Sequence, residues 1–398
     1  MKISQKILHK LSRVTSTGKY IPEIDALRFL AIMPVVLLHA RNFLIVKSGD
    51  SYSLPPENDW IAQLTAHGHY GVQLFFVISG FVLALPFAAH YLQAAPAVKL
   101  KHYYFRRLTR LEPPYVLVLL ICFGLFVLLG KNSAKDLAPH LAAGLSYSHS
   151  LVYGTHNVLN LVTWSLEVEI QFYLLVPLLA KLFTLSGKGR RRGVLIFICL
   201  LLTTSQSLFF PAEGRLSLSI LNFLQYFLIG FLLADVYLCD WNEAPRHHLR
   251  WDVVSLIGWP LLLWLFEWPR LTTLLLPFML FWLYCSVFRS VYVRRLLTRP
   301  LLTVIGGMCY TIYLIHFQVI SFVGRLFPPV KVSGHFFINY LLELLILLPI
   351  LAFFAVAFFA CVERPCMKKD WPARLRRKLR GFLMPQTKLE KSAVTSIE

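Results

Sequence analysis

The residues of this sequence that are best suited to chemistry are ionisable side chains inside apolar stretches. Arg28 and His39 both lie in the apolar segment 24–43, eleven residues apart. In a helix this spacing is within about 20° of a whole number of turns, so both side chains share one face, about 16 Å apart along the axis. Such groups are costly in a bilayer unless they face a protein interior or a water-filled cavity. The shared face favours a functional pair over a packed histidine and an arginine that reaches the helix end.

A second polar group begins the apolar segment 163–182, whose first residues read TWSLEVEIQFY. In a helix, Glu169 and Tyr173 share a face, while Glu167 points to the opposite side. We expect Glu169 to lie at about the depth of His39, where a carboxylate can orient an imidazole as a proton acceptor. A structural ion pair or a carboxylate at the helix start is the alternative interpretation for either glutamate.

Two further segments carry candidate residues. Ser79 and Gly80 lie in GVQLFFVISGF, where close helix packing is the favoured interpretation and a substrate-facing Ser79 is the alternative. Arg107 and Arg110 are three residues apart, so they either flank a span as ordinary positive charges or clamp phosphates from one helix face. Weaker candidates for substrate contact are Trp164, Tyr313 and His316.

The elements that must position these residues are membrane helices. Of 398 residues, 57% are hydrophobic and 15% are charged, whereas an ordinary soluble domain carries about 25% charged residues. The apolar residues form blocks of about 20, the length that crosses a bilayer as a helix. We therefore predict an all-α fold, a polytopic bundle of about ten transmembrane helices. The spans are expected at 25–44, 70–90, 113–130, 163–182, 193–210, 217–238, 253–267, 271–288, 302–323 and 338–361.

The connections between these blocks alternate between rich and poor in Lys and Arg, which predicts that both termini are cytoplasmic. The expected organisation is a basic N-terminus (1–23), a membrane domain (24–366) and a basic tail (367–398). The net charge of +20 is explained by this pattern, so we expect a lipid bilayer and no nucleic acid as partner. The longest connection, 131–162, is predicted as a loop that can re-enter the membrane between Leu137 and Val152.

Taken together, these segments resemble the acyltransferase 3 family of integral membrane acyltransferases. Arg28 and His39, within IDALRFLAIMPVVLLHA, match its Arg-x10-His pattern, and GVQLFFVISGF is similar to its GVxxFFVxSGF segment. Arg107 and Arg110 match its basic motif. WSLEVEIQFY, YTIYLIH and VERP match the remaining landmarks, in the family's order, from residue 20 to 366. Within VERP, Pro365 stops the helix and Glu363 can pair with a basic neighbour, so a structural role is expected for Glu363.

The resemblance implies an enzyme of a bacterial inner membrane. It implies a ten-helix bundle that takes acyl-CoA, with acetyl-CoA expected, from the cytoplasm and O-acylates a cell-surface carbohydrate or a lipid-linked sugar. By position, Arg28, His39 and Glu169 are the implied catalytic residues, and Arg107 and Arg110 are implied at the acyl-CoA. In the resulting mechanism His39, held by Glu169, deprotonates the acceptor hydroxyl, and an acyl-His39 intermediate is left open. No metal is expected.

The sequence departs from the family pattern in two respects. Where the family often has two adjacent glutamates, this chain has Glu169-Ile170 and an additional Glu167, so either carboxylate is a candidate. The resemblance does not include the hydrolase-like C-terminal domain of some members. Transfer is therefore expected to be completed by the membrane domain or by a separate extracytoplasmic partner, and a homo-oligomer is also left open.

Two other functions compete with this interpretation. Intramembrane Arg, His and Glu also serve proton relays, so a transporter of a small or proton-coupled substrate is the main rival class. Transporters often show internal repeats, and the sequence has none that we detect. Acyl transfer to a small secreted metabolite is the second alternative. Release of thiol from acyl-CoA by the purified protein distinguishes an enzyme from a transporter.

Overall fold

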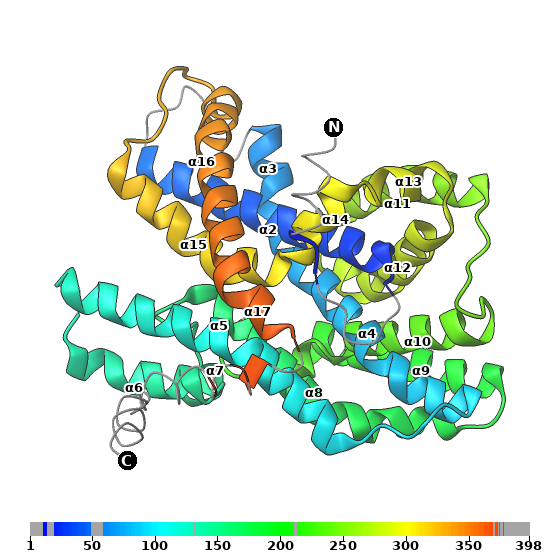
Figure 1. The fold of residues 1–398 in the computed structure, drawn as a ribbon. Coiled ribbons are helices and arrows are strands. Elements are labelled where there is room, and N and C mark those ends of the chain that lie inside the picture. The colour runs from blue at the N-terminus through cyan, green and yellow to red at the C-terminus, as the bar shows by residue number, and fades with distance from the viewer. Residues whose placement is uncertain are drawn as a thin grey trace, which may run out of the picture.

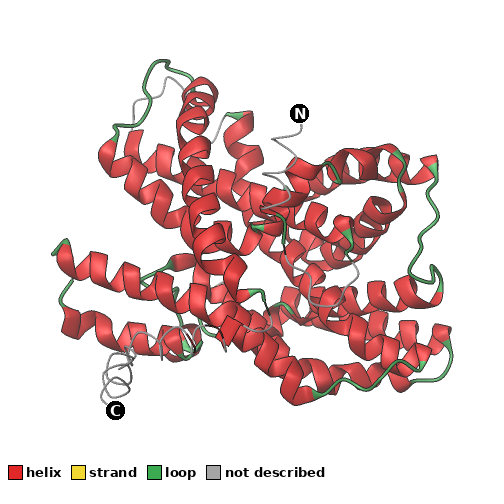
Figure 2. Ribbon diagram, in the orientation of Figure 1, coloured by secondary structure: helices red, strands yellow, loops and turns green. Residues whose placement is uncertain are grey.

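The computed structural model describes residues 11–13, 20–48, 59–130, 132–210, 213–368, 371, 372, 374 and 377. Every regular element in these residues is a helix, and they contain no strand (Figure 2). Most of the predicted terminal segments, 1–23 and 367–398, lies outside the described residues. The long helices are Pro22–Ser48 (α2), Gly71–Gln93 (α4), Leu100–Leu128 (α5), Trp164–Leu179 (α8), Lys188–Phe209 (α9), Leu224–Cys239 (α10), Leu249–Leu265 (α11), Pro269–Arg289 (α12), Cys309–Leu326 (α15) and Phe336–Phe358 (α16).

Shorter helices connect and extend the long ones. The short α-helices are Trp60–Ala66 (α3), Ala134–Leu145 (α6), His149–Tyr153 (α7), Tyr292–Leu297 (α13), Pro300–Gly307 (α14) and Arg364–Cys366 (α17). Single 3-10 turns are His67–Tyr70 (η2), Leu161–Thr163 (η3), Ala180–Thr184 (η4) and Ile220–Asn222 (η5), and Phe359–Glu363 (η6) is a π-helical turn.

The predicted all-α membrane fold is confirmed, and each of the ten predicted spans overlaps a helix. The single span predicted at 302–323 is divided into α14 and α15, and the span predicted at 217–238 is α-helical only from Leu224. In the part of the chain that the structure describes, seven helical stretches are long and apolar enough to cross a membrane. The other three predicted spans correspond to α8, α10 and α11, which are helices of 16, 16 and 17 residues, slightly shorter than the roughly 20 residues that a span usually needs. The number ten and the cytoplasmic position of the termini therefore stay predictions.

The segment predicted as a loop at 131–162 contains two helices, α6 and α7. Ser133 caps α6 because its side chain accepts a hydrogen bond from the Asp136 N–H at 3.1 Å. Gly154 ends α7 with a φ of +70°, a conformation that glycine adopts at little cost. In Figure 1, α6 lies alongside the second half of α5, and the two helices project from one side of the bundle.

Helix α4 packs against both α2 and α10 (Figure 1). Most of α10 is buried, and its closest neighbour is α4. Gly80 on α4 and Gly230 on α10 permit this approach, since a Cβ on Gly80 would lie 2.2 Å from the Phe227 carbonyl oxygen. The same holds for Gly230, whose Cβ would lie 2.4 Å from the Phe81 nitrogen. The close packing that the Ser79-Gly80 pair predicts is therefore present.

Candidate active site

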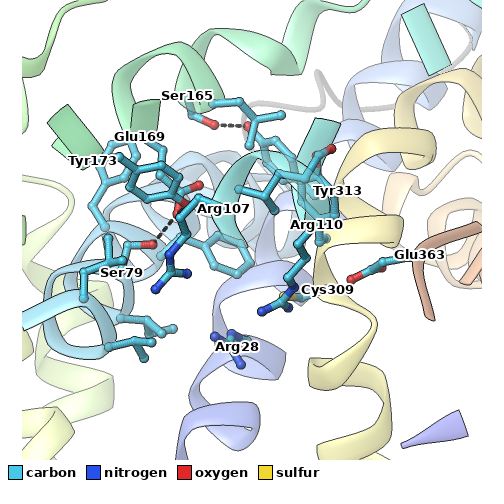
Figure 3. A pocket seen from close by; sticks show the side chains of 18 of the residues that line it. Arg28, Ser79, Arg107, Arg110, Ser165, Glu169, Tyr173, Cys309, Tyr313 and Glu363 are labelled. Carbon is cyan, nitrogen blue, oxygen red and sulfur yellow. Dashed lines mark hydrogen bonds between the residues drawn. The ribbon is translucent and has the colours of Figure 1, made fainter. Parts of the chain in front are cut away.

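A cavity of about 110 Å³ lies between α2, α4, α5, α8 and α15. Its lining brings together side chains that are far apart in the sequence, and it is shown from close by in Figure 3. Six of the residues predicted from the sequence line it: Arg28, Ser79, Arg107, Arg110, Glu169 and Tyr313. The remaining three, His39, Trp164 and His316, do not belong to this lining.

Glu169 is held by two hydroxyl groups in this cavity. Ser79 Oγ donates to Glu169 Oε1 at 2.7 Å, and Tyr173 OH donates to the same oxygen at 2.6 Å. Tyr173 and Glu169 are four residues apart on α8, so they lie on the same face of the helix, as the sequence predicted. Within the described part of the chain Glu169 Oε2 has no hydrogen-bond partner, which leaves one carboxylate oxygen for a ligand.

Arginine side chains gather opposite this acidic group, as Figure 3 shows for Arg28, Arg107 and Arg110. Arg28 donates to Asp25 Oδ1 at 2.6 Å and forms an ion pair within α2. The Arg107 guanidinium lies 5.5 Å from the centre of the Tyr173 ring, a cation–π contact that places Arg107 next to Glu169. Arg110 Nε is buried and has no hydrogen-bond partner among the described residues.

Arg13 joins this group from the segment before α2, a contribution that the sequence did not predict. It lines the cavity and pairs with Asp25 Oδ1 at 3.4 Å. Burial lowers the pKa of Arg13, and the nearby charge of Arg110 adds to this effect, whereas Asp25 opposes it. A guanidinium remains protonated in proteins despite such shifts, so Arg13 contributes a positive charge.

A second cavity, of about 590 Å³, adjoins the first. Arg13, Arg107 and Arg110 line both cavities. The larger one adds further basic side chains from the start of α5: Lys99, His102 and Arg106. A large basic cavity at the start of α5 therefore shares its arginines with the small cavity that contains Glu169.

His39 lies outside both cavities and does not pair with Glu169 as the sequence predicted. Its ring contacts the ring of His316, with centroids 5.1 Å apart, and the edge of Phe317 at 5.4 Å. Tyr313 connects the two regions, since it lines the small cavity and its ring lies 5.9 Å from that of His316. The sequence predicted that His39 and Glu169 lie at the same depth, but it did not specify which helix packs against α2 at His39. That helix is α15.

The two glutamates of α8 have different surroundings. Glu167 is fully buried, and its Oε2 accepts a hydrogen bond from the Ser150 N–H at 2.8 Å, which fixes α7 to α8. Of these two glutamates, Glu169 lines the small cavity and Glu167 does not. Trp164 contacts the ring of Phe223 at 5.3 Å and lies away from the cavity. The sequence left both carboxylates open, and the geometry favours Glu169 as the one that meets a ligand.

Glu363 is a further acidic group of the small cavity, which the sequence assigned to structure. It is fully buried and accepts hydrogen bonds from the Thr311 N–H at 3.1 Å and from Thr311 Oγ1 at 2.5 Å. It ends the π-helical turn η6, a distortion that is frequent at functional sites. The sequence feature that could have identified Glu363 as a site residue is its position in the VERP segment. Among the described residues, no group of three or more His, Cys, Asp or Glu side chains is placed to hold a metal ion.

Comparison with known proteins gives a family match over most of the chain. A family model described as an acyltransferase domain matches residues 21–362. The O-acetyltransferase OatA of Staphylococcus aureus (strain NCTC 8325 / PS 47) is 23% identical over 388 residues, covering 89% of this chain and 58% of that protein. A candidate O-acetyltransferase of Staphylococcus aureus (strain COL) is 24% identical over 345 residues, or 77% of this chain and 51% of that protein.

The chain thus spans about half the length of the curated relatives it matches. No solved structure matches it significantly.

Proposed function

Because the chain belongs to the acyltransferase domain family, we propose that it is a membrane-bound O-acyltransferase that uses cytoplasmic acyl-CoA. The expected donor is acetyl-CoA, and the expected acceptor is a hydroxyl of a cell-surface carbohydrate or a lipid-linked sugar at a bacterial inner membrane. The family resemblance in the sequence motifs is confirmed by the match. The names of the relatives, O-acetyltransferases at 23% and 24% identity, support the type of group transferred.

The observation that carries this proposal is the junction of the two cavities at Arg13, Arg107 and Arg110. A CoA thioester has several phosphates at one end and a neutral arm with the acyl group at the other. Arginine side chains bind phosphates through charge-assisted, often bidentate hydrogen bonds. The large basic cavity is suited to the phosphates, and the narrow cavity beyond the arginines is suited to the neutral arm.

Glu169 has a defined role in this arrangement. Its Oε1 is occupied by Ser79 and Tyr173, so its Oε2 can accept a hydrogen bond from an amide N–H of the pantetheine arm. The carboxylate also counters the positive charge of the nearby arginines. In this proposal Glu169 orients the donor inside the small cavity.

The transfer itself needs a base at the acceptor hydroxyl, and His39 is the proposed one. The hydroxyl oxygen attacks the thioester carbonyl carbon while His39 takes its proton. The carbon–sulfur bond then breaks, the acyl group remains on the acceptor oxygen as an ester, and His39 returns the proton to the leaving CoA thiolate. Tyr313 lines the small cavity and its ring lies 5.9 Å from that of His316, so in this proposal the thioester passes the Tyr313 ring to reach His39.

Thiol release from acetyl-CoA by the detergent-purified protein tests the donor. The wild type should release thiol when a hydroxyl acceptor is present, and Arg110→Ala should raise the KM for acetyl-CoA. A lost charge-assisted hydrogen bond costs about 1.5–3 kcal/mol, so the expected increase in KM is about 10- to 150-fold. Arg190→Ala is the matched control, because Arg190 is an exposed arginine in the first turn of α9 and lines neither cavity.

Absence of thiol release from acetyl-CoA and longer acyl-CoA thioesters would contradict the enzymatic proposal and favour the transporter class. If Arg110→Ala and Arg190→Ala have the same KM for acetyl-CoA, Arg110 does not bind the donor. The protein would then still be an acyltransferase, but its donor would bind at another place.

Mass spectrometry of the surface glycans and lipids of the host identifies the acceptor. A deletion strain complemented with the wild type should regain a defined acyl mass, and one complemented with His39→Ala should not. Wild-type acylation with His39→Ala would exclude His39 as the base. A glycan and lipid profile that the deletion leaves unchanged would exclude these two acceptor classes and point to a small secreted metabolite.

A further inference from the structure

His316, whose ring contacts that of His39, has no role in the mechanism proposed above. A histidine that acts as a base is usually oriented by a hydrogen-bond acceptor at its other ring nitrogen. Glu169 does not serve this purpose, since it is bound to Ser79 and Tyr173. His39 itself has no hydrogen-bond partner in the described part of the chain, and the polar ring in contact with it is that of His316.

The hydrogen bonds of His316 define which of its nitrogens is free. His316 Nδ1 lies 2.8 Å from the Tyr313 carbonyl oxygen and 3.0 Å from the Ile312 carbonyl oxygen. Both oxygens are acceptors only, so Nδ1 carries the proton and Nε2 is a bare acceptor. His316 is fully buried, and its Nε2 has no partner among the described residues. A buried acceptor without a donor destabilises the folded protein, so a donor at this position is favoured.

The distance between the two rings fits a hydrogen bond between their nitrogens. Elsewhere in this chain, His140 Nδ1 and His149 Nε2 lie 2.9 Å apart, within hydrogen-bond distance. The centroids of those two rings are 5.1 Å apart, the same separation as that between His39 and His316. A ring separation of 5.1 Å is therefore compatible with a hydrogen bond between two histidines, and the His39–His316 bond requires a rotation of the His39 ring that turns its N–H toward His316 Nε2.

We propose that His316 is the positioning residue for His39: its Nε2 accepts the hydrogen bond of the His39 N–H. The second nitrogen of His39 is then unprotonated and held toward the acceptor hydroxyl. The main-chain carbonyls of Ile312 and Tyr313 hold the His316 ring in the tautomer that this requires. The role of His39 as a base rests on the proposed function, whereas the His39–His316 hydrogen bond does not.

Two substitutions of His316 separate positioning from anchoring. In His316→Asn, the side-chain amide nitrogen takes the place of Nδ1 and can still donate to the carbonyls, but no acceptor remains near His39. In His316→Gln, the longer side chain places an amide oxygen near the position of Nε2. We expect His316→Asn to lower kcat about 100-fold, the cost of a misplaced catalytic group, with an unchanged KM for acetyl-CoA. We expect His316→Gln to restore most of kcat.

The reverse order, with activity in His316→Asn and loss in His316→Gln, would show that His316 only anchors α15 and would overturn the proposal. His90→Asn is the control, because His90 also bonds a carbonyl oxygen, that of Ala95, but lies at the end of α4 and lines none of the described cavities. Its kcat should equal that of the wild type.

A second measurement does not depend on activity. In protein labelled with 15N-histidine, the ring nitrogen shifts distinguish a protonated from a bare nitrogen, and the His39 signals are identified by their loss in His39→Gln. The wild type and His316→Gln should show one His39 tautomer, and His316→Asn should show averaged shifts. Identical His39 shifts in all three proteins would overturn the proposal. If the wild type has no transferase activity, the proposed function is refuted. The hydrogen bond between His39 and His316 is then still tested by the ring nitrogen shifts.

Discussion

Replacement of Gly80 by alanine tests the packing that positions the site. Gly80 lies on α4 directly after Ser79, where α4 meets the buried helix α10. An added Cβ would lie 2.2 Å from the Phe227 carbonyl oxygen, about 1.2 Å closer than an ordinary contact of 3.4 Å. The obstructing atom belongs to the backbone, so it cannot be relieved by a side-chain rotation, and one of the two helices must move.

The expected effect has two parts. Overpacking of a well-packed interior costs about 1–3 kcal/mol, and alanine returns about 1 kcal/mol through its higher helix propensity. The net result is a destabilised protein with a lower melting temperature. A helix displacement of this size also exceeds what the 2.7 Å hydrogen bond from Ser79 to Glu169 tolerates, so acyl transfer should decrease as well.

The assay is thermal unfolding in detergent, followed by intrinsic fluorescence, together with thiol release from acetyl-CoA. Gly124→Ala is the control, because Gly124 is also helical but has no atom within 4 Å of its added Cβ. That variant should melt at or above the temperature of the wild type. If Gly80→Ala melts with the wild type and retains its activity, α4 and α10 do not approach each other as closely as described.

Two further substitutions test charged groups. Asp235→Asn should lower the melting temperature strongly. The Nε atoms of Arg191 and Arg192 donate to the fully buried Asp235 carboxylate, and breaking a buried ion pair costs about 3–5 kcal/mol. A melting curve equal to that of the wild type would contradict this prediction. Glu167→Gln should reduce stability by about 1 kcal/mol and leave kcat unchanged, whereas Glu169→Gln should raise the KM for acetyl-CoA without changing the melting temperature. Equal behaviour of these two variants in both assays would refute the different roles assigned to the glutamates.

The candidate site was only partly predictable from the sequence. The motifs identified Arg28 as a catalytic candidate and Arg107 and Arg110 as acyl-CoA-binding candidates, and the structure places all three around one cavity. Arg13 was not identified, because a basic residue outside an apolar span has no periodicity that relates it to the site. Glu363 was assigned to structure because a helix-ending Glu-Arg-Pro segment is explained by local geometry alone.

What the sequence by itself determined is the membrane class, the positions of the apolar helices, and the face and depth of each polar residue along its own helix. These properties depend on local composition and on the 3.6-residue period. The tertiary structure alone decided which helix lies next to which. His39 therefore contacts His316, 277 residues away, and Glu169 is held by Ser79, 90 residues away. Periodicity specifies the direction of a side chain on one helix, but its partner depends on the packing of whole helices, which close contacts such as that at Gly80 decide.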